Sequence, residues 1–128
     1  MTESFEGRLL IVDDDRNLRR LLAATFGGGK YEIHEAGNGA DAMALAMRLR
    51  PEVVLLDVML PGEPDGLEVC RQIKAQPELK ETKVILLTAL GQQGDRSRGE
   101  QAGADAYVVK PFSPLALVEL VEALQETY

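Results

Sequence analysis

Short apolar runs alternate with segments of helical periodicity along the chain, and this alternation limits the possible folds more than any other feature. Apolar residues run without interruption at 9–12, 53–56, 84–87 and 107–109, and a mixed run covers 31–36. These runs are too short for helices, and most of them lack the polar–apolar alternation of a strand with one exposed face. They are typical of strands that are buried on both faces of a parallel sheet.

Segments with helical spacing separate the predicted strands. Four residues form one apolar helical stripe near the N-terminus: Leu18, Leu21, Leu22 and Thr25. Further segments rich in helix-forming residues lie at 40–50, 66–75 and 113–125. Five strand–helix units therefore follow one another. With right-handed crossovers they predict a five-stranded, doubly wound parallel sheet between two helical layers, which is an α/β three-layer sandwich of the flavodoxin-like type.

The length, charge and cysteine content of the chain narrow the class of protein. A chain of 128 residues fits a single domain, which we expect to cover 1–128 with a core of about 7–127. The net charge of −7 argues against nucleic acid or an anionic membrane surface as the main partner. No apolar run approaches the ~18 residues of a membrane span. A single cysteine, Cys70, excludes an internal disulfide and favours a reducing, cytoplasmic location.

Three consecutive aspartates follow the first predicted strand directly, at 13–15. At ~4 Å, two like charges near a protein surface repel each other by roughly 4 kcal/mol. A solvated turn, a helix cap, a cation or a shared proton must therefore offset the repulsion. Asp15 immediately precedes the first predicted helix, so we expect its side chain to cap that helix.

Polar side chains also end three of the later strands. Asp57 follows the apolar run at 53–56, Thr88 follows the run at 84–87, and Lys110 follows the run at 107–109. Sites in open parallel sheets form outside the carboxyl ends of the strands, near the point where the strand order reverses. A single polar residue at a strand end is usually a cap. Together with Asp13 and Asp14, however, these residues predict a functional site at one edge of the sheet.

Six sequence segments resemble the receiver domain of response regulators in bacterial two-component signalling. In chain order they are LIVDDD, EAGNGADA, VVLLDVMLPG, DGLEVCRQIK, VILLTAL and GADAYVVKPF. Together they cover almost the whole chain, in the order and spacing of the family. The resemblance implies that Asp57 is the phosphoacceptor and that Thr88 and Lys110 contact the phosphoryl group. It also implies that Tyr107 is the aromatic residue of the switch and that the Lys110–Pro111 peptide bond is cis.

The resemblance further implies a divalent cation, Mg²⁺ or Mn²⁺, at the acidic edge. Mg²⁺ takes oxygen ligands and usually binds one or two carboxylates while it keeps several waters. We expect Asp14 and Asp57 to bind the cation directly and Asp13 to bind it directly or through water. The family also uses the backbone carbonyl two residues after the phosphoacceptor, which is that of Met59 here. A bound cation would explain why the chain tolerates its consecutive aspartates.

The implied function is phosphorelay signal transduction rather than enzymatic turnover of a separate substrate. The expected phosphodonor is a sensor histidine kinase or a phosphotransfer protein, and the expected readout surface covers roughly 91–128. Because the chain stops at Tyr128, we expect no output domain in it, and a downstream protein or a linked domain is the expected receiver of the signal. The resemblance further implies that the residues two after the phosphoacceptor and two after the threonine flank the path of hydrolytic water. These are Met59 and Leu90 here, and their apolar side chains predict slow dephosphorylation.

The final predicted helix bears on self-association. Its charged residues are all acidic, namely Glu119, Glu122 and Glu126. An isologous dimer must complement itself, and two acidic helices would repel each other. We therefore expect a monomer or a weak dimer that binds a different partner.

Two other classes of protein compete with the receiver domain. A haloacid-dehalogenase-like phosphatase also forms an aspartyl phosphate, and the aspartates at 13–15 followed by Thr88 and Lys110 match the order of its motifs. However, Asn17 stands where that family has Thr or Val, no aspartate follows Lys110, and no insertion could form a cap domain. A receiver-like module that is never phosphorylated is disfavoured because every residue that the phosphorylation chemistry needs is present.

One departure from the receiver pattern is the loop LPGEPDG, which has one extra residue before Asp65.

Overall fold

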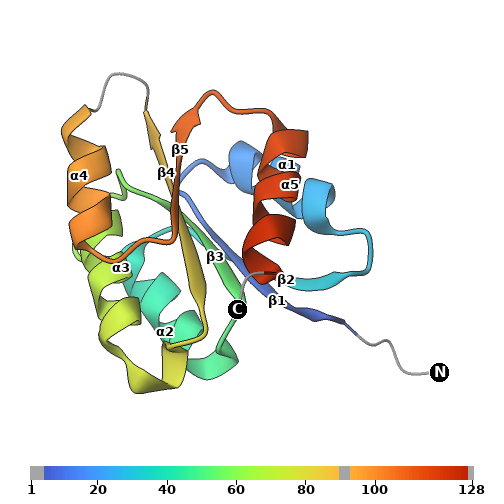
Figure 1. Cartoon of the computed structure of the whole chain (residues 1–128), viewed down its shortest axis with the longest axis horizontal. Coiled ribbons are helices and arrows are strands. Elements are labelled where there is room, and N and C mark those ends of the chain that lie inside the picture. The colour runs from blue at the N-terminus through green and yellow to red at the C-terminus, as the bar shows by residue number, and fades with distance from the viewer. Residues whose placement is uncertain (1–4, 90–92, 127–128) are drawn as a thin grey trace.

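The computed structural model of the chain describes residues 5–89 and 93–126, without the side chains of residues 93–96 (Figure 1). Strands and helices alternate over these residues, and a 3₁₀ turn, η1, interrupts the alternation once. The elements are β1 (Gly7–Val12), α1 (Arg16–Phe26), β2 (Tyr31–Ala36), α2 (Gly39–Leu49), β3 (Val53–Asp57), α3 (Gly66–Ala75), η1 (Pro77–Leu79), β4 (Lys83–Ala89), α4 (Gln93–Gln101), β5 (Ala106–Lys110) and α5 (Pro114–Gln125).

The five strands form one parallel sheet with the order β2-β1-β3-β4-β5. The order reverses next to β1, because β2 pairs on one side of it and β3 on the other. Figure 1 shows α1 and α5 on one face of the sheet and α2, α3 and α4 on the other. The predicted doubly wound, three-layer architecture is therefore confirmed.

The continuous apolar runs are explained by the two cores that the sheet separates. In β1, Leu9 and Ile11 pack with residues of α1 and α5, whereas Leu10 and Val12 pack with residues of α2 and α3. All four side chains are fully buried. Successive side chains of a strand point to opposite faces, so a strand covered on both faces needs apolar residues at every position.

Side-chain caps fix the helix starts that lead away from the strand ends. The Asp15 carboxylate accepts hydrogen bonds from the backbone N–H groups of Asn17 and Leu18 at the start of α1. Ser113 caps α5 in the same way, and Asp65 caps α3. The cap predicted for Asp15 is confirmed, and this contact separates its role from that of the two aspartates before it.

The apolar stripe expected on the first helix is wrong at one position. Leu22 and Phe26 are buried, but Leu21 is 50% exposed. Neighbouring residues of a helix lie about 100° apart around its axis, so a helix that turns Leu22 fully toward the sheet points Leu21 away from it. The turn η1, between α3 and β4, was also absent from the sequence prediction.

Cys70 lies in the core, as its helical spacing predicted. Its side chain is fully buried, and Sγ lies 3.6 Å from the backbone oxygen of Ala102, to which it can donate. Burial raises the pKa of the thiol to about 11, so the reactive thiolate is disfavoured.

Among the described residues, no helix combines the length and apolar character that a bilayer crossing requires.

Candidate functional site

The carboxyl ends of β1, β3, β4 and β5 bring polar side chains to one edge of the sheet. Asp57 is the last residue of β3 and Lys110 the last residue of β5, while Asp13 directly follows β1. Asp13 is 1% exposed and Asp57 is 4% exposed, and Thr88, near the end of β4, is fully buried. Such burial of charged groups requires partners that offset the loss of hydration.

Asp13 uses both carboxylate oxygens for contacts within the chain. Its Oδ1 accepts a 2.9 Å hydrogen bond from the backbone N–H of Asp15, and its Oδ2 accepts a 2.8 Å hydrogen bond from Lys110 Nζ. The second contact is an ion pair between residues that are far apart in the sequence. It joins the ends of β1 and β5 across the intervening strands β3 and β4.

Asp57 is less completely compensated than Asp13. Its Oδ1 accepts a 3.1 Å hydrogen bond from the backbone N–H of Met59 and lies 3.7 Å from Lys110 Nζ. Burial raises the pKa of the Asp57 carboxyl group, and the charges of Asp13 and Asp14 add to this rise, while Met59 and Lys110 oppose it. The protein therefore holds this carboxylate at a site that disfavours its negative charge.

The acidic neighbours of Lys110 favour its charged form. Burial by itself lowers the pKa of the Lys110 ammonium, but the hydrogen bond to Asp13 and the charges of Asp57 and Asp13 outweigh burial, and the pKa is raised overall. Lys110 therefore stays protonated at neutral pH. A compact ammonium of this kind acts as a point charge that can contact carboxylate or phosphate oxygens.

Asp13, Asp14 and Asp57 each present a carboxylate oxygen such that the three oxygens lie within 4.8 Å of one another. Asp14 is exposed, and within the described ranges no hydrogen bond or ion pair reaches its carboxylate. Three carboxylates thus face one ammonium, that of Lys110. An all-oxygen donor set with excess negative charge suits a hard divalent cation such as Mg²⁺ or Mn²⁺. The residues present therefore fit the cation that the sequence predicted.

Thr88 and Tyr107 share one face of the sheet. Thr88 follows Leu86 by two residues in β4, so their side chains point to the same face, and Leu86 pairs in register with Tyr107 of β5. Leu86 and Tyr107 pack in the same apolar cluster, beneath α4. Helix α4 approaches closely through Gly99, because an added Cβ there would lie 2.8 Å from Leu86 Cδ1 and 3.7 Å from Tyr107 Cδ2.

The loop after β3 holds the backbone of Asp57 tightly. At Gly66 an added Cβ would lie 2.0 Å from the backbone oxygen of Asp57, and at Gly39 it would lie 2.0 Å from the backbone oxygen of Pro64. The Glu63–Pro64 peptide bond is cis, and so is Lys110–Pro111. The cis bond at Lys110–Pro111 was predicted from the resemblance. The one in the extended loop was not predicted.

Arg19 and Gly66 also lie at this edge of the sheet, although the sequence did not single them out. Arg19 Nη1 donates to the backbone oxygen of Asp13 at 2.7 Å. The available signal for Gly66 was its position directly after the capping Asp65, where a helix begins with glycine rather than with a better helix former. Arg19 gave no such signal, because exposed arginines are common on amphipathic helices.

Comparison with known proteins decides the family. The family described as "Response regulator receiver domain" matches residues 9–122. The chain belongs to this family. The transcriptional regulatory protein ResD of Bacillus subtilis is 45% identical over 124 residues, which are 97% of this chain and 50% of ResD. The transcriptional regulatory protein SrrA of Staphylococcus aureus is 47% identical over 116 residues, 91% of this chain and 46% of SrrA. This receiver domain therefore spans about half the length of these relatives.

Solved structures agree with this membership. A putative response regulator from Chloroflexus aurantiacus is 34% identical with a TM-score of 0.87, and the match covers 94% of this chain and 98% of that one. The BeF₃-activated DrrB receiver domain is 36% identical with a TM-score of 0.83, over 94% of this chain and 98% of that one. The chemotaxis response regulator CheY4 of Vibrio cholerae is 28% identical, with a TM-score of 0.85 over 94% of this chain and 99% of CheY4.

Family membership sets the general function of the domain. It is a receiver domain of two-component response regulators, and phosphorelay signal transduction fits it better than the phosphatase alternative. Receiver domains are not classical enzymes. They interact with histidine kinases and output domains, and they bind Mg²⁺ in an acidic pocket. The acidic cluster of Asp13, Asp14 and Asp57 is the corresponding feature here.

Proposed function

We propose that this receiver domain accepts a phosphoryl group on Asp57 from the phosphohistidine of a sensor kinase or a phosphotransfer protein. One observation carries the proposal: the buried Asp57 carboxylate lies within 4.8 Å of two further carboxylates and 3.7 Å from the Lys110 ammonium. Phosphoryl transfer depends mainly on positioning and on charge stabilisation around the phosphoryl oxygens. The ends of the strands provide both at Asp57.

Asp57 acts as the nucleophile in this proposal. Its carboxylate oxygen attacks phosphorus while the imidazole of the donor leaves, and an acyl phosphate results. Lys110 contacts a phosphoryl oxygen with its ammonium, and the Thr88 hydroxyl contacts another. When bound, Mg²⁺ or Mn²⁺ supplies positive charge that offsets the charges of the carboxylates and the phosphoryl oxygens.

The contacts of Asp13 support different modes of cation binding, direct or through water, for the proposed metal-binding residues. Both oxygens of Asp13 already accept hydrogen bonds, from Asp15 and from Lys110. Asp14 and Asp57 would therefore hold the cation directly, and Asp13 would hold it through water. The backbone of Met59 lies beside Asp57, since its N–H donates to Asp57 Oδ1, and its carbonyl would be the remaining protein ligand.

Phosphorylation then changes the surface of α4, β5 and α5. Thr88 moves toward the phosphoryl group, and Tyr107 rotates into the space that Thr88 leaves. Support comes from the shared sheet face of these residues and from the close approach of α4 at Gly99. The altered surface binds a downstream protein or a linked output domain.

The same surface argues for heterologous binding rather than strong self-association. Glu119 and Glu122 on α5 and Glu126 at its C-cap are all exposed, and so is the apolar Leu115 in the first turn of α5. Two such acidic helices repel each other across a two-fold axis. The domain thus acts as a monomer or a weak dimer and contacts neither nucleic acid nor a membrane directly. It covers residues 1–128 as one unit, and its membership of a two-component system supports a cytoplasmic location.

Intact mass spectrometry after incubation with a small acyl-phosphate donor and Mg²⁺ tests the proposal. We expect one phosphate adduct in the wild type and none in Asp57→Asn. Asp65→Asn is a matched control because Asp65 lies at the end of the loop that follows Asp57, and because Asn also caps helices well; this variant should be labelled like the wild type. Continuous turnover of the donor would indicate a phosphatase, and the absence of any adduct would indicate an unphosphorylated binding module.

A further inference from the structure

The guanidinium group of Arg19 joins the acidic edge to the end of β2. Its Nη1 donates to the backbone oxygen of Asp13 at 2.7 Å, and its Nε donates to Glu35 Oε1 at 3.1 Å. The side chain is 18% exposed, so most of it is held against the protein. The planar fork of an arginine fixes two acceptors relative to each other, which a lysine cannot do.

The acceptor at Asp13 is part of the peptide group that connects the two aspartates of the cluster. A peptide group is planar, so fixing the carbonyl of Asp13 also fixes the direction in which the chain continues to Asp14. The N–H of Asp13 donates to the backbone oxygen of Ala36 at 3.1 Å. The N–H of Asp13 thus contacts the end of β2 directly, at Ala36. The carbonyl of Asp13 is linked to the end of β2 through Arg19, which also binds Glu35.

Space for this arrangement is provided by Gly37. An added Cβ at Gly37 would lie 3.3 Å from Arg19 Nη1, which is tighter than an ordinary contact. The guanidinium therefore fills the space beside a residue that has no side chain. Asp14, in contrast, is exposed and has no hydrogen-bond partner among the described residues, so its position depends on its backbone.

We propose that Arg19 is a positioning residue for the cation site, which acts by fixing the Asp13–Asp14 peptide group in the orientation that lets both carboxylates face Asp57. The inference rests on the proposed cation site. Positive charge on Arg19 would by itself oppose the binding of a cation nearby. Removing the side chain therefore has opposite effects under the two explanations: weaker Mg²⁺ binding if Arg19 positions the aspartates, and tighter binding if only its charge matters.

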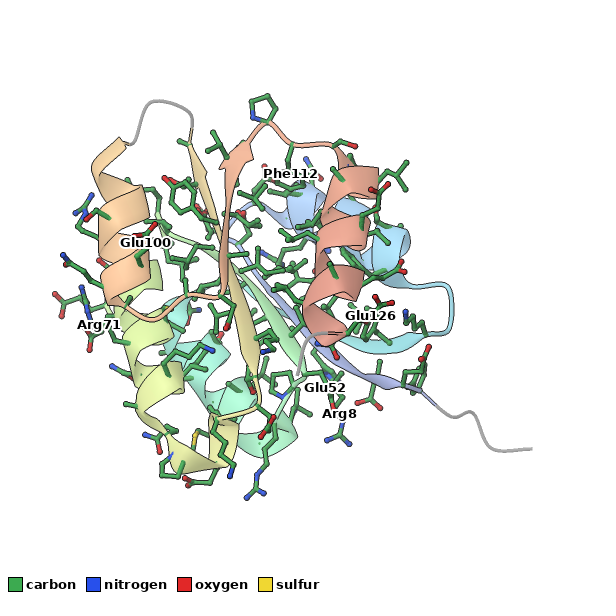
Figure 2. The ribbon with its side chains drawn as sticks, in the orientation of Figure 1. Arg8, Glu52, Arg71, Glu100, Phe112 and Glu126 are labelled. Carbon is green, nitrogen blue, oxygen red and sulfur yellow. The ribbon has the colours of Figure 1, made fainter. Side chains whose placement is uncertain are left out.

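Arg8 provides a matched control within the same sheet. Its Nε donates to Glu32 Oε2 at 2.8 Å and its Nη1 to the backbone oxygen of Leu49 at 2.9 Å, so it also joins a glutamate of β2 to a backbone carbonyl. Figure 2 shows Arg8 near Glu52, at the end of the sheet opposite Phe112, the residue that follows Pro111 after β5. Loss of Arg8 removes a similar pair of contacts far from the acidic cluster.

The test is a titration of thermal stability with Mg²⁺ alone, in which each variant is compared with its own metal-free midpoint. Arg19→Ala should weaken the apparent Mg²⁺ affinity by about 10-fold, at the lower end of the range for outer partners of metal ligands. Arg8→Ala should leave the affinity unchanged. Arg19→Lys keeps the charge but loses the fork, so its affinity should fall between those of the wild type and Arg19→Ala.

A second pair of variants covers the case in which Arg19→Ala does not fold. Glu35→Gln loosens the anchor of Arg19 without touching the aspartates, and it should weaken Mg²⁺ binding about 3-fold, a smaller effect than that of an outer-shell deletion. Glu32→Gln removes the same charge at the other end of β2 and should leave the binding unchanged. The initial rate of labelling by an acyl-phosphate donor at low Mg²⁺ should follow the same order among the variants.

The outcomes separate this inference from the proposed function. If the wild type gains no stability from Mg²⁺, both the cation site and the role of Arg19 are wrong. If the wild type gains stability and Asp14→Ala does not, the cation site holds. In that case an Arg19→Ala affinity equal to or tighter than that of the wild type overturns the positioning role, as does equal weakening by Arg8→Ala.

Discussion

Lys110 forms a 2.8 Å ion pair with Asp13, a residue that is almost fully buried at the opposite side of the site. The same ammonium lies 3.7 Å from Asp57 Oδ1. Lys110 is thus shared unequally between two carboxylates, and the closer contact goes to Asp13. This inequality leaves Asp57 with the less compensated negative charge.

The Asp57→Asn variant should be more stable than the wild type in the absence of metal at pH 7. Burial and neighbouring carboxylates raise the pKa of Asp57 above 3.8 in the folded chain, so between the unfolded pKa and the raised folded pKa the folded state keeps a proton that the unfolded state has lost. Stability therefore falls as the pH rises from the unfolded pKa through the raised folded pKa, and it stays lower above that window. We expect this substitution to raise the thermal midpoint by about 4 °C, equivalent to about 1 kcal/mol.

This stabilisation should depend on pH, and thermal unfolding followed by circular dichroism measures it. Below the unfolded pKa both states are protonated, so the advantage of Asp57→Asn should disappear there. Asp65→Asn, at an exposed cap, should show no comparable gain at pH 7. A gain that is the same at acidic and neutral pH, or a loss of stability at pH 7, would contradict the electrostatic explanation.

Lys110→Met should destabilise the metal-free protein because it leaves Asp13 buried without its ion-pair partner. Breaking a buried pair in this way is destabilising by about 3–5 kcal/mol, and because Lys110 is partly exposed we expect about 2 kcal/mol. Mg²⁺ should restore more stability to this variant than to the wild type, since it then provides the missing positive charge. Chemical denaturation with and without Mg²⁺ measures both effects, with Lys80→Met as an exposed control. Equal Mg²⁺ stabilisation of wild type and Lys110→Met would count against a shared charge network.

Gly66→Ala should distort the end of β3. The added Cβ would lie 2.0 Å from the backbone oxygen of Asp57 and 2.7 Å from the Cα of Val58, and backbone atoms cannot move away as a flexible side chain can. We expect a loss of at least about 2 kcal/mol, within the range for overpacked sites, and slower labelling by an acyl-phosphate donor. Gly28→Ala is the control, because nothing lies within 4 Å of a Cβ there. Unchanged stability of Gly66→Ala would show that the loop adjusts freely.

The phosphorylated state should decay slowly, and Met59→Asn should accelerate its decay. The Met59 side chain is 61% exposed and carries no group that can orient a water molecule as Asn can. Leu90, the other residue expected to flank the path of water, lies outside the described residues. A combined Met59→Asn and Leu90→Glu variant should lose its phosphate about 10-fold faster, which is less than the roughly 10²–10⁴-fold effect of a positioned general acid or base, because these side chains would only orient the water molecule. Decay of the intact-mass adduct gives the rate, and equal lifetimes in variant and wild type would refute the prediction.

The sequence predicted the sheet and the convergence of Asp13, Asp57 and Lys110 because both follow from strand burial. A strand covered on both faces must be apolar throughout, and its carboxyl end lies at the same edge as those of its parallel neighbours. Leu21 could not be placed correctly by spacing alone, since the angle at which a helix meets a sheet depends on packing. The exposure of Leu21 is a consequence of the full burial of Leu22.

The sequence pattern could not predict contacts between elements that are distant in the sequence. Arg19 reaches the backbone of Asp13 and the side chain of Glu35, and only the spatial neighbourhood of β1 and β2 makes this possible. Likewise, the extra residue in the loop after β3 was visible in the sequence, but the approach of Pro64 to Gly39 was not. Motifs locate groups that share a strand end, whereas the residues that hold those groups in place come from tertiary packing.

Chemical trapping tests whether Asp57 carries the phosphoryl group. An acyl phosphate is reduced by borohydride, which converts the aspartate into homoserine, and peptide mass spectrometry then locates the converted residue. After incubation with an acyl-phosphate donor and Mg²⁺, we expect homoserine at position 57 and unmodified aspartate at positions 13 and 14. Homoserine at position 13 or 14 of the wild type, with position 57 unmodified, would contradict it.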